Sequence, residues 1–350
     1  MKAIELLYRA ALEIRSERIL VINAQAHPLL LTIKEQCSHL DIQQHFKPEF
    51  AAIEHIGLSV SPHWPDSGNM YDLILLKPSK NKQQTQAWMA LAFNSLKDSG
   101  HIIVACANEH GAKSYESALE KLAGNIASRS KSKCRIFSAR NSAAFNSELA
   151  KQWIDTALPC RIDSYGLISR PGLFSWNRAD TGSSLLLDQL PELSGIGMDL
   201  CCGFGLLAEQ IMHRQMERKQ MIREQMVRKQ SGVEKIHLVE ADILALDCAI
   251  LNTQPWQQHI LSHWSDATSD PLPSDLDWVV CNPPFHTGQN RDVGLGQSIA
   301  LRACASLKRG GSLYLVANRK LPYERLLQSE LQSCQTLIET NGFKIIKGIR

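Results

Sequence analysis

Two stretches of the chain, far apart in sequence, carry the same features in the same order. Residues 71–108 contain YDLILLKPSK and later SLKDSGHIIVACAN, and residues 276–318 contain LDWVVCNPPF and later SLKRGGSLYLVAN. In each stretch an Asp opens an apolar strand, a Pro follows the strand, and Leu-Lys-x-x-Gly leads into a second apolar strand after a helix-length gap. Such an internal repeat constrains the fold strongly, because both copies must form the same unit. The sequence therefore predicts a duplicated domain.

Strands alternate with helical stretches in both halves, which is typical of an α/β fold with mostly parallel sheets and helices on both faces. We predict two tandem Rossmann-like domains, and 350 residues suffice for two cores. The segment ALPCRIDSYGLISRPGLFS changes from a helical pattern to short strands and Pro/Gly turns. We therefore assign residues 1–155 to the first domain and 156–350 to the second.

Composition excludes several classes of protein. No apolar run reaches the ~18 residues of a spanning helix, and MKAIELLYRAALEIRSERIL has the pattern of an amphipathic helix and lacks the features of a signal peptide. The ten cysteines are scattered, without a C-x-x-C metal spacing, so we expect reduced thiols, no metal and a cytoplasmic protein. A net charge of +3 permits a nucleic-acid partner but does not require one.

The second half contains a glycine-rich turn that the first half lacks. In GIGMDLCCGFGLLAEQIM an apolar strand ends at Asp199 and Leu200, and a turn with Gly203 and Gly205 leads into a helix. The matching stretch RILVINAQAHPLLLTI has no glycine, so backbone could not approach a ligand there as closely. We expect a nucleotide-type site in the second half only, at the carboxyl edge of its sheet, and a first half that kept the fold and lost the site.

Acidic residues follow the next strands. In KIHLVEAD, Glu240 ends an apolar run and is suited to accept hydrogen bonds from ribose hydroxyls, whereas Asp242 could equally cap the next helix. In HWSDAT, Asp266 could accept from an adenine amino group or be an ordinary turn residue. Ala208 stands where a dinucleotide fingerprint has its third glycine. S-adenosylmethionine has no phosphate to bind and fits better, with Asp199 facing its methionine end.

A long stretch rich in Arg and Lys follows the helix that begins after the glycine turn. Residues 213–232 have no internal Gly before the last position and no Pro. We interpret them as a helix extension or helical insertion that is either a solvated surface or a contact to phosphate.

CNPPFH follows the strand of the second repeat. Proline fixes φ near about −65° and removes an N–H donor, so two in a row form a stiff corner. We expect the side-chain oxygen of Asn282 and a neighbouring carbonyl at Pro283 to accept both hydrogens of an exocyclic amino group. Phe285 would stack on the base, and His286 would line the pocket. The alternative is a simple strand-ending turn.

Together the glycine turn, the acid after strand two and Asn-Pro-Pro-Phe-His resemble the ribosomal small-subunit methyltransferase C family, which are 16S rRNA (guanine-N2)-methyltransferases of class I. RPGLFSWNRADTGSSLLL and NGFKIIKGIR are also similar to segments of that family. The resemblance implies S-adenosyl-L-methionine as cofactor, ribosomal RNA or the small ribosomal subunit as partner, and a cytoplasmic location; we expect a monomer. It implies cofactor binding by Asp199, Gly203, Gly205, Glu240 and Asp266, and guanine binding by Asn282, Pro283 and Phe285.

One departure from the family lies in the turn, which usually reads Asp-x-Gly-Cys-Gly-x-Gly. Cys201 occupies the first glycine position, and it would be strained if that backbone needs a positive φ. Three alternatives remain open at this point: a 23S rRNA guanine-N2 methyltransferase with the same Asn-Pro-Pro-Phe-His, a non-catalytic RNA-binding protein, and a nicotinamide-dependent oxidoreductase.

Overall fold

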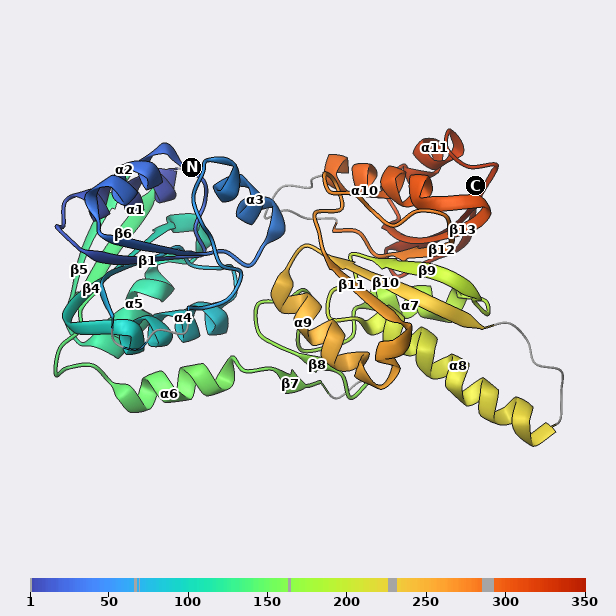
Figure 1. Cartoon of the computed structure of the whole chain (residues 1–350), viewed down its shortest axis with the longest axis horizontal. Helices are drawn as coiled ribbons and strands as arrows, with labels where there is room; N and C mark the ends of the chain where they lie inside the picture. The colour runs from blue at the N-terminus through green and yellow to red at the C-terminus, as the bar shows by residue number, and fades with distance from the viewer. Residues whose placement is uncertain (1, 66–67, 69, 163–164, 226–231, 285–292) are drawn as a thin grey trace. The chain divides into compact units, whose positions relative to one another are not determined.

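The computed structural model describes residues 2–65, 68, 70–162, 165–225, 232–284 and 293–350 (Figure 1). The chain forms two compact units. The first comprises residues 1–159 together with 170–172, and the second comprises residues 160–169 and 173–350. Each unit builds its own core around one central sheet.

The first unit contains a six-stranded sheet of order β2-β1-β3-β4-β6-β5. Its strands are β1 (Arg18–Ile22), β2 (His39–Gln43), β3 (Tyr71–Leu76), β4 (Leu96–Ala107), β5 (Ile126–Lys131) and β6 (Cys134–Arg140). The first four pair in parallel, and β6 and β5 add an antiparallel edge. The parallel strands β1 and β3 are almost fully buried, as expected for a sheet that is covered on both faces.

Helices cover both faces of this sheet. They are α1 (Lys2–Leu12), α2 (Pro28–Gln36), α3 (Lys47–His55), α4 (Lys82–Ser95), α5 (Ala112–Ala123) and α6 (Ser147–Thr156), with the 3-10 turn η1 (Asn108–His110). Apolar side chains of α1, α2 and α3 form the core on one face, and those of α4, α5 and α6 form the core on the other. Most of this unit's helices begin with a polar cap or a proline, such as Asn81 before α4.

The second unit contains a seven-stranded sheet of order β11-β10-β9-β12-β13-β15-β14. Its strands are β9 (Gly195–Leu200), β10 (Val233–Glu240), β11 (Ile260–Trp264), β12 (Leu276–Cys281), β13 (Leu307–Asn318), β14 (Ser333–Thr340) and β15 (Phe343–Ile349). The short strands β7 (Cys160–Arg161) and β8 (Ile168–Ser169) pair separately. Apart from the added edge strand β11, the order and direction repeat those of the first sheet, which confirms the predicted duplication and the mostly parallel α/β fold.

The helices of the second unit also lie on both faces of the sheet. They are α7 (Thr181–Gln189), α8 (Leu206–Gln225), α9 (Ile243–Asn252), α10 (Val293–Ser306) and α11 (Tyr323–Gln328), with the 3-10 turn η2 (Gln254–His259). The cores contain α7, α8 and α9 on one face and α10 and α11 on the other. Residues 213–225 of the basic stretch continue α8, as the helix-extension interpretation predicted, and residues 226–231 lie outside the described residues.

The added edge strand has a reduced counterpart in the first unit. There, a single parallel bridge between Gln43 and Ser61 takes the place of β11. The amide of Gln44 donates to the carbonyl of Ser61 at 2.9 Å. Among the described residues, the first unit therefore has a single bridge where the second has a strand of five residues.

Two further expectations concern membranes and thiols. Within the described ranges, no helix is both long enough and apolar enough to cross a lipid bilayer. All ten cysteines are free thiols.

The repeated Asp and Lys of the sequence form the same ion pair in both units. Asp72 accepts hydrogen bonds from the Arg18 amide at 2.9 Å and from Lys97 Nζ at 2.8 Å. Asp277 accepts from the Ile196 amide at 2.8 Å and pairs with Lys308. Each carboxylate thus ties the start of its own strand to the starts of the two neighbouring parallel strands. This contact explains why the Asp and the Leu-Lys-x-x-Gly turn recur together.

We expect Asp277→Ala to lower the free energy of unfolding by about 1–2 kcal/mol, because a backbone donor and a lysine lose their partner. Partial burial opposes ionisation of Asp277, but the hydrogen bonds from Lys308 and the Ile196 amide outweigh it and lower the pKa. The contribution should therefore be lost as the pH falls through that lowered pKa. Urea unfolding at neutral and acidic pH measures both effects. Asp188→Ala, at an exposed position of α7, is the control, and equal loss in the two variants would contradict the assignment.

Candidate active site

Asp199 lies at the carboxyl end of β9 and is completely buried. Its Oδ2 accepts the amide of Ala208 in the first turn of α8 at 3.1 Å, and its Oδ1 has no hydrogen-bond partner among the described residues. Burial raises the pKa of Asp199 to about 7, and the nearby Glu240 carboxylate adds to the rise. A buried carboxylate oxygen without a donor is costly unless a donor or a cation is supplied from outside the chain.

The turn after β9 has the backbone that the glycines predict. Gly203 and Gly205 have φ of 54° and 84°, a left-handed region that favours glycine. A Cβ on Gly205 would lie 3.0 Å from the backbone of Ala249, whereas a Cβ on Gly203 would meet nothing within 4 Å. The space in front of Gly203 is therefore open, and its backbone can be approached closely.

Cys201 shares this left-handed backbone, with φ of 61°, so the condition for strain at this position is met. Its thiol interacts with Cys281 at the end of the neighbouring strand β12. This interaction and burial together raise the pKa of the Cys201 thiol well above the ordinary range. Cys201 is therefore a neutral thiol that packs between two strand ends.

Glu240, at the end of β10, holds two turns through backbone donors. Its Oε2 accepts the amide of Gly203 at 2.9 Å, and its Oε1 accepts the amides of Ala241 and Asp242 at 2.8 and 3.0 Å. Burial raises its pKa, and these hydrogen bonds oppose the rise. Asp242 caps α9 by accepting the Leu244 amide. Of the two acids, Asp242 is therefore the helix cap, and Glu240, which the sequence favoured for the site, adjoins the glycine turn.

Asp266 follows β11, whose last residue Trp264 is the register partner of Glu240. Its Oδ1 accepts the amide and hydroxyl of Thr268 at 2.8 and 2.7 Å, and its Oδ2 accepts the Ser269 hydroxyl at 3.0 Å. The structure thus brings Asp266 to the same sheet edge as Glu240. Both of its carboxylate oxygens stabilise its own turn.

Asn282 follows β12, and its carboxamide is held by the start of α7. Its Nδ2 donates to Asp180 Oδ2 at 2.9 Å and to Ser183 Oγ at 2.8 Å. Sequence reasoning did not select Asp180 or Ser183. The pattern Asp-x-x-Ser before an apolar run would have indicated a helix N-cap, which Asp180 is, but not its partner 102 residues away.

The corner after Asn282 is only partly described. Pro283 is buried and Pro284 is exposed. Phe285 and His286, predicted to contact the base, lie outside the described residues, which resume at Val293.

The first unit lacks these groups at the matching positions. Strand register and the positive φ of Asn23, which corresponds to Cys201, align the two copies. Val21 then replaces Asp199, Gln44 replaces Glu240, and Lys77 replaces Asn282. Gln25 stands at the position of Gly203, where its backbone exchanges hydrogen bonds with the Tyr8 hydroxyl and its side chain donates to Glu49. The first copy therefore has neither of the two carboxylates and no open turn.

The residues of the second unit fit S-adenosylmethionine. The unpaired Oδ1 of Asp199 can accept from an ammonium group, and the open space at Gly203 leaves room beside the turn. Glu240 presents a carboxylate at the end of the next strand. Among the described residues, no three potential metal ligands of the His, Cys, Asp or Glu type come together.

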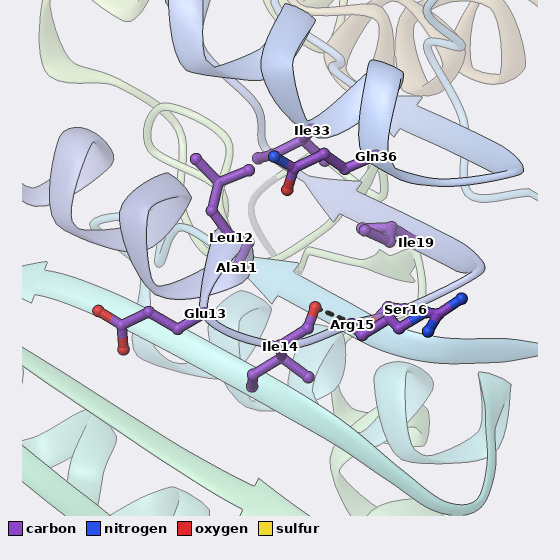
Figure 2. A pocket seen from close by; sticks show the side chains of 9 residues that line it. All are labelled: Ala11, Leu12, Glu13, Ile14, Arg15, Ser16, Ile19, Ile33 and Gln36. Atoms are coloured by element: carbon purple, nitrogen blue, oxygen red, sulfur yellow. Dashed lines mark hydrogen bonds between the residues drawn. The ribbon is translucent and has the colours of Figure 1, made fainter.

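A hollow of the first unit lies at the opposite edge of its sheet from the carboxyl ends of the strands. It has a volume of about 400 Å³ and is formed where the chain passes from α1 into β1 (Figure 2). Glu13 at its rim pairs with Arg129 at 3.3 Å. Its lining is Ala11, Leu12, Glu13, Ile14, Arg15, Ser16, Ile19, Ile33 and Gln36. It has none of the features expected of a nucleotide site.

The left-handed backbone at position 201 predicts an inverted order of stability. In the middle of a helix or strand, a protein with Gly is less stable to unfolding than one with Ala by about 0.5–1 kcal/mol. At position 201 we expect Cys201→Gly to be more stable than Cys201→Ala by about 1 kcal/mol, because both lack the thiol and only Ala keeps the strained Cβ. Thermal or urea unfolding of the two variants measures the difference, and the ordinary order would show that the turn is unstrained.

Two family models match the chain. The Methyltransferase small domain model matches residues 164–347, and the Methyltransferase small domain N-terminal model matches residues 5–157. Among solved structures, the fold is similar to that of the T. thermophilus 16S rRNA N2 G1207 methyltransferase in complex with AdoMet and guanosine. The similarity has a TM-score of 0.79 at 21% identity and covers 100% of this chain and 92% of the other.

Two curated relatives have the name ribosomal RNA small subunit methyltransferase C. The protein from Psychromonas ingrahamii is 30% identical over 283 residues, which cover 80% of this chain and 76% of the relative. The protein from Shewanella pealeana is 25% identical over 362 aligned residues, with 99% of both chains covered. The chain therefore belongs to the ribosomal RNA small subunit methyltransferase C family and is a methyltransferase that uses S-adenosylmethionine.

Proposed function

We propose that the chain transfers a methyl group from S-adenosylmethionine to the exocyclic N2 of a guanine in 16S rRNA. The single observation that carries the proposal is the orientation of Asn282. Its Nδ2 is bound to Asp180 and Ser183, so its oxygen is turned the other way, as an acceptor at the sheet edge that carries Asp199 and Glu240. The named activity of the relatives supports the same reaction.

Each residue of the proposed site has a separate task. Asp199 would accept from the ammonium group of the cofactor, the open turn at Gly203 and Gly205 would lie against it, and Glu240 would accept from the ribose hydroxyls. The Asp266 turn would flank the adenine. When bound, S-adenosylmethionine supplies an electrophilic methyl group on a sulfonium.

The acceptor amine would be held by the Asn-Pro-Pro corner. Asn282 Oδ1 and the Pro283 carbonyl would accept its two hydrogens, which fixes the direction of the nitrogen lone pair. The N–H groups become more acidic as positive charge develops on nitrogen, so these acceptors bind the transition state more tightly than the ground state. Phe285 would stack on the base. Most of the rate enhancement would then come from positioning.

The role proposed for the first unit follows from the residues at the positions that match the site of the second unit. With Val21, Gln44 and Lys77 in place of the two carboxylates and the carboxamide, we propose that it binds no methyl donor. Its hairpin β5–β6 exposes Lys131 and Lys133 at the turn. Arg129 and Arg135 of the same hairpin are held in ion pairs with Glu13 and Glu116. A role in holding RNA phosphate would therefore belong to the two lysines.

We further propose that the protein acts as a monomer in the cytoplasm and that its partner is ribosomal RNA or the small ribosomal subunit. Size-exclusion chromatography with light scattering would determine the oligomeric state.

Methyl transfer tests the function directly. Purified protein is incubated with labelled S-adenosylmethionine and with unmodified 16S rRNA, small subunits or 23S rRNA, and the product nucleoside is identified by mass spectrometry. We expect N2-methylguanosine in 16S rRNA or the small subunit.

Asn282→Ala should lower kcat by about 100-fold or more, the usual effect of removing one transition-state hydrogen-bond partner. Gln257→Ala, which removes an exposed carboxamide on η2, is the control. Product only in 23S rRNA, or full activity of Asn282→Ala, would overturn the proposal.

Cofactor binding should depend on pH through Asp199. Because its pKa is raised to about 7, the carboxylate that binds an ammonium group forms only as the pH rises through 7. Affinity for S-adenosylmethionine should increase by up to about tenfold per pH unit below pH 7, and Asp199→Asn should bind weakly with a flat profile. Calorimetric titration from pH 6 to 7.5 measures this.

The same raised pKa has a consequence without cofactor. The folded state holds the proton of Asp199 more tightly than the unfolded state does, so this group's contribution to stability is present at low pH and is lost as the pH rises through 7. Asp199→Asn should therefore gain stability relative to wild type between pH 5 and 8. If urea unfolding gives Asp199→Asn no gain in the free energy of unfolding over this pH range, Asp199 is already ionised in the folded wild type.

A further inference from the structure

The carboxamide of Asn282 has one orientation that its partners allow. An ionised carboxylate only accepts hydrogen bonds, so the atom 2.9 Å from Asp180 Oδ2 must be the nitrogen. Ser183 Oγ lies 2.8 Å from the same nitrogen and accepts its second hydrogen. A flipped carboxamide would place two oxygens against each other at Asp180. The carboxylate therefore removes the flip ambiguity that an isolated asparagine has.

The partners themselves are held by the fold. Asp180 is the N-cap of α7, and its Oδ2 also accepts the Ser183 amide at 2.8 Å. Leu186 and Leu187 anchor the helix in the core with exposures of 0% and 1%. At Gly182 a Cβ would lie 3.1 Å from the side chain of Val316 on β13, so helix and sheet are closely packed. The two acceptors thus sit on a rigid element.

The negative charge adds an electronic effect to the geometric one. Hydrogen bonds in a chain polarise one another, and a bond to an ionised partner is stronger than one between neutral groups. A carboxylate that accepts from Nδ2 draws positive charge toward the nitrogen end of the amide and leaves Oδ1 a stronger acceptor. That gain is largest for a donor that becomes positively charged during the reaction.

We propose that Asp180 and Ser183 are positioning residues that act through Asn282: they hold its oxygen toward the acceptor amine and strengthen it as an acceptor. The inference rests on the proposed function. It also adds a specificity determinant, because a site that presents only acceptors binds an amino group and rejects a carbonyl oxygen at that position. Both residues bind the nitrogen end of the Asn282 carboxamide and not the oxygen that is proposed to bind the amine.

A spectroscopic test is independent of methyl transfer. In protein with labelled asparagine, the side-chain NH2 signals of Asn282 are assigned by their loss in Asn282→Ala. Asp180→Ser keeps a residue that can cap α7 but is too short to reach Asn282. We expect the Asn282 signals to move toward those of a free amide in Asp180→Ser combined with Ser183→Ala, and to stay in place in Asp188→Ser, on the exposed side of the same helix. Unchanged signals in the double variant would overturn the proposal.

The kinetic test compares two serine variants of α7. Asp180→Ser should lower kcat by about 10- to 100-fold while the KM for S-adenosylmethionine stays unchanged, because only the acceptor side is affected. Asp188→Ser should leave kcat unchanged. A residue needed only to cap the helix would predict full activity for Asp180→Ser, because serine also caps helices.

The outcomes separate the two proposals. Wild type without transfer to any rRNA would remove the proposed function, while the NH2 signals would still report the orientation. An active wild type with an equally active Asp180→Ser would remove this inference alone.

Discussion

The carboxylate of Glu240 is the contact on which the geometry of the site depends. One oxygen binds the amide of Gly203 across the gap between two strand ends, and the other binds the two amides that start the next turn. Loss of this side chain would leave three backbone donors to find other partners and would release the glycine turn from the neighbouring strand. Glu240 therefore shapes the turn whether or not a ligand is present. Burial raises the pKa values of both Glu240 and Asp199. Ionising either carboxylate in the folded protein therefore costs free energy.

The two copies of the domain separate what the fold requires from what the chemistry requires. Asp72 and Asp277 make the same contacts in both units, each with a lysine at the start of one neighbouring strand and an amide at the start of the other. Asp199 and Glu240, in contrast, are replaced by Val21 and Gln44 in the first unit. Gln44 still accepts the Phe46 amide at 2.9 Å, as Glu240 accepts that of Asp242. The turn has kept its hydrogen bond and lost its charge, as expected if the bond serves the fold and the charge serves a ligand.

Much of this arrangement was predictable from local patterns. The repeat indicated duplication, and Asp199, Glu240 and Asn282 could be found because each lies at the end of an apolar strand. The hydrogen bonds from Asn282 to Asp180 and Ser183 could not be predicted, because they join residues about 100 positions apart that meet only when a helix packs on the sheet. For Asp266 the unpredicted contacts are local. Its place in the order of strands was predicted correctly, but strand order cannot indicate the hydrogen bonds that it accepts from Thr268 and Ser269 in its own turn.

The shortened edge of the first sheet bears on how far the duplicated half has diverged. In the second unit, β11 runs beside β10 for five residues and carries the chain to the turn at Asp266. In the described part of the first unit, the Gln43–Ser61 bridge stands in place of this strand. Substituting the glycines and acids of the second unit at the matching positions of the first would therefore not reproduce this sheet edge, because the backbone differs there as well as the side chains.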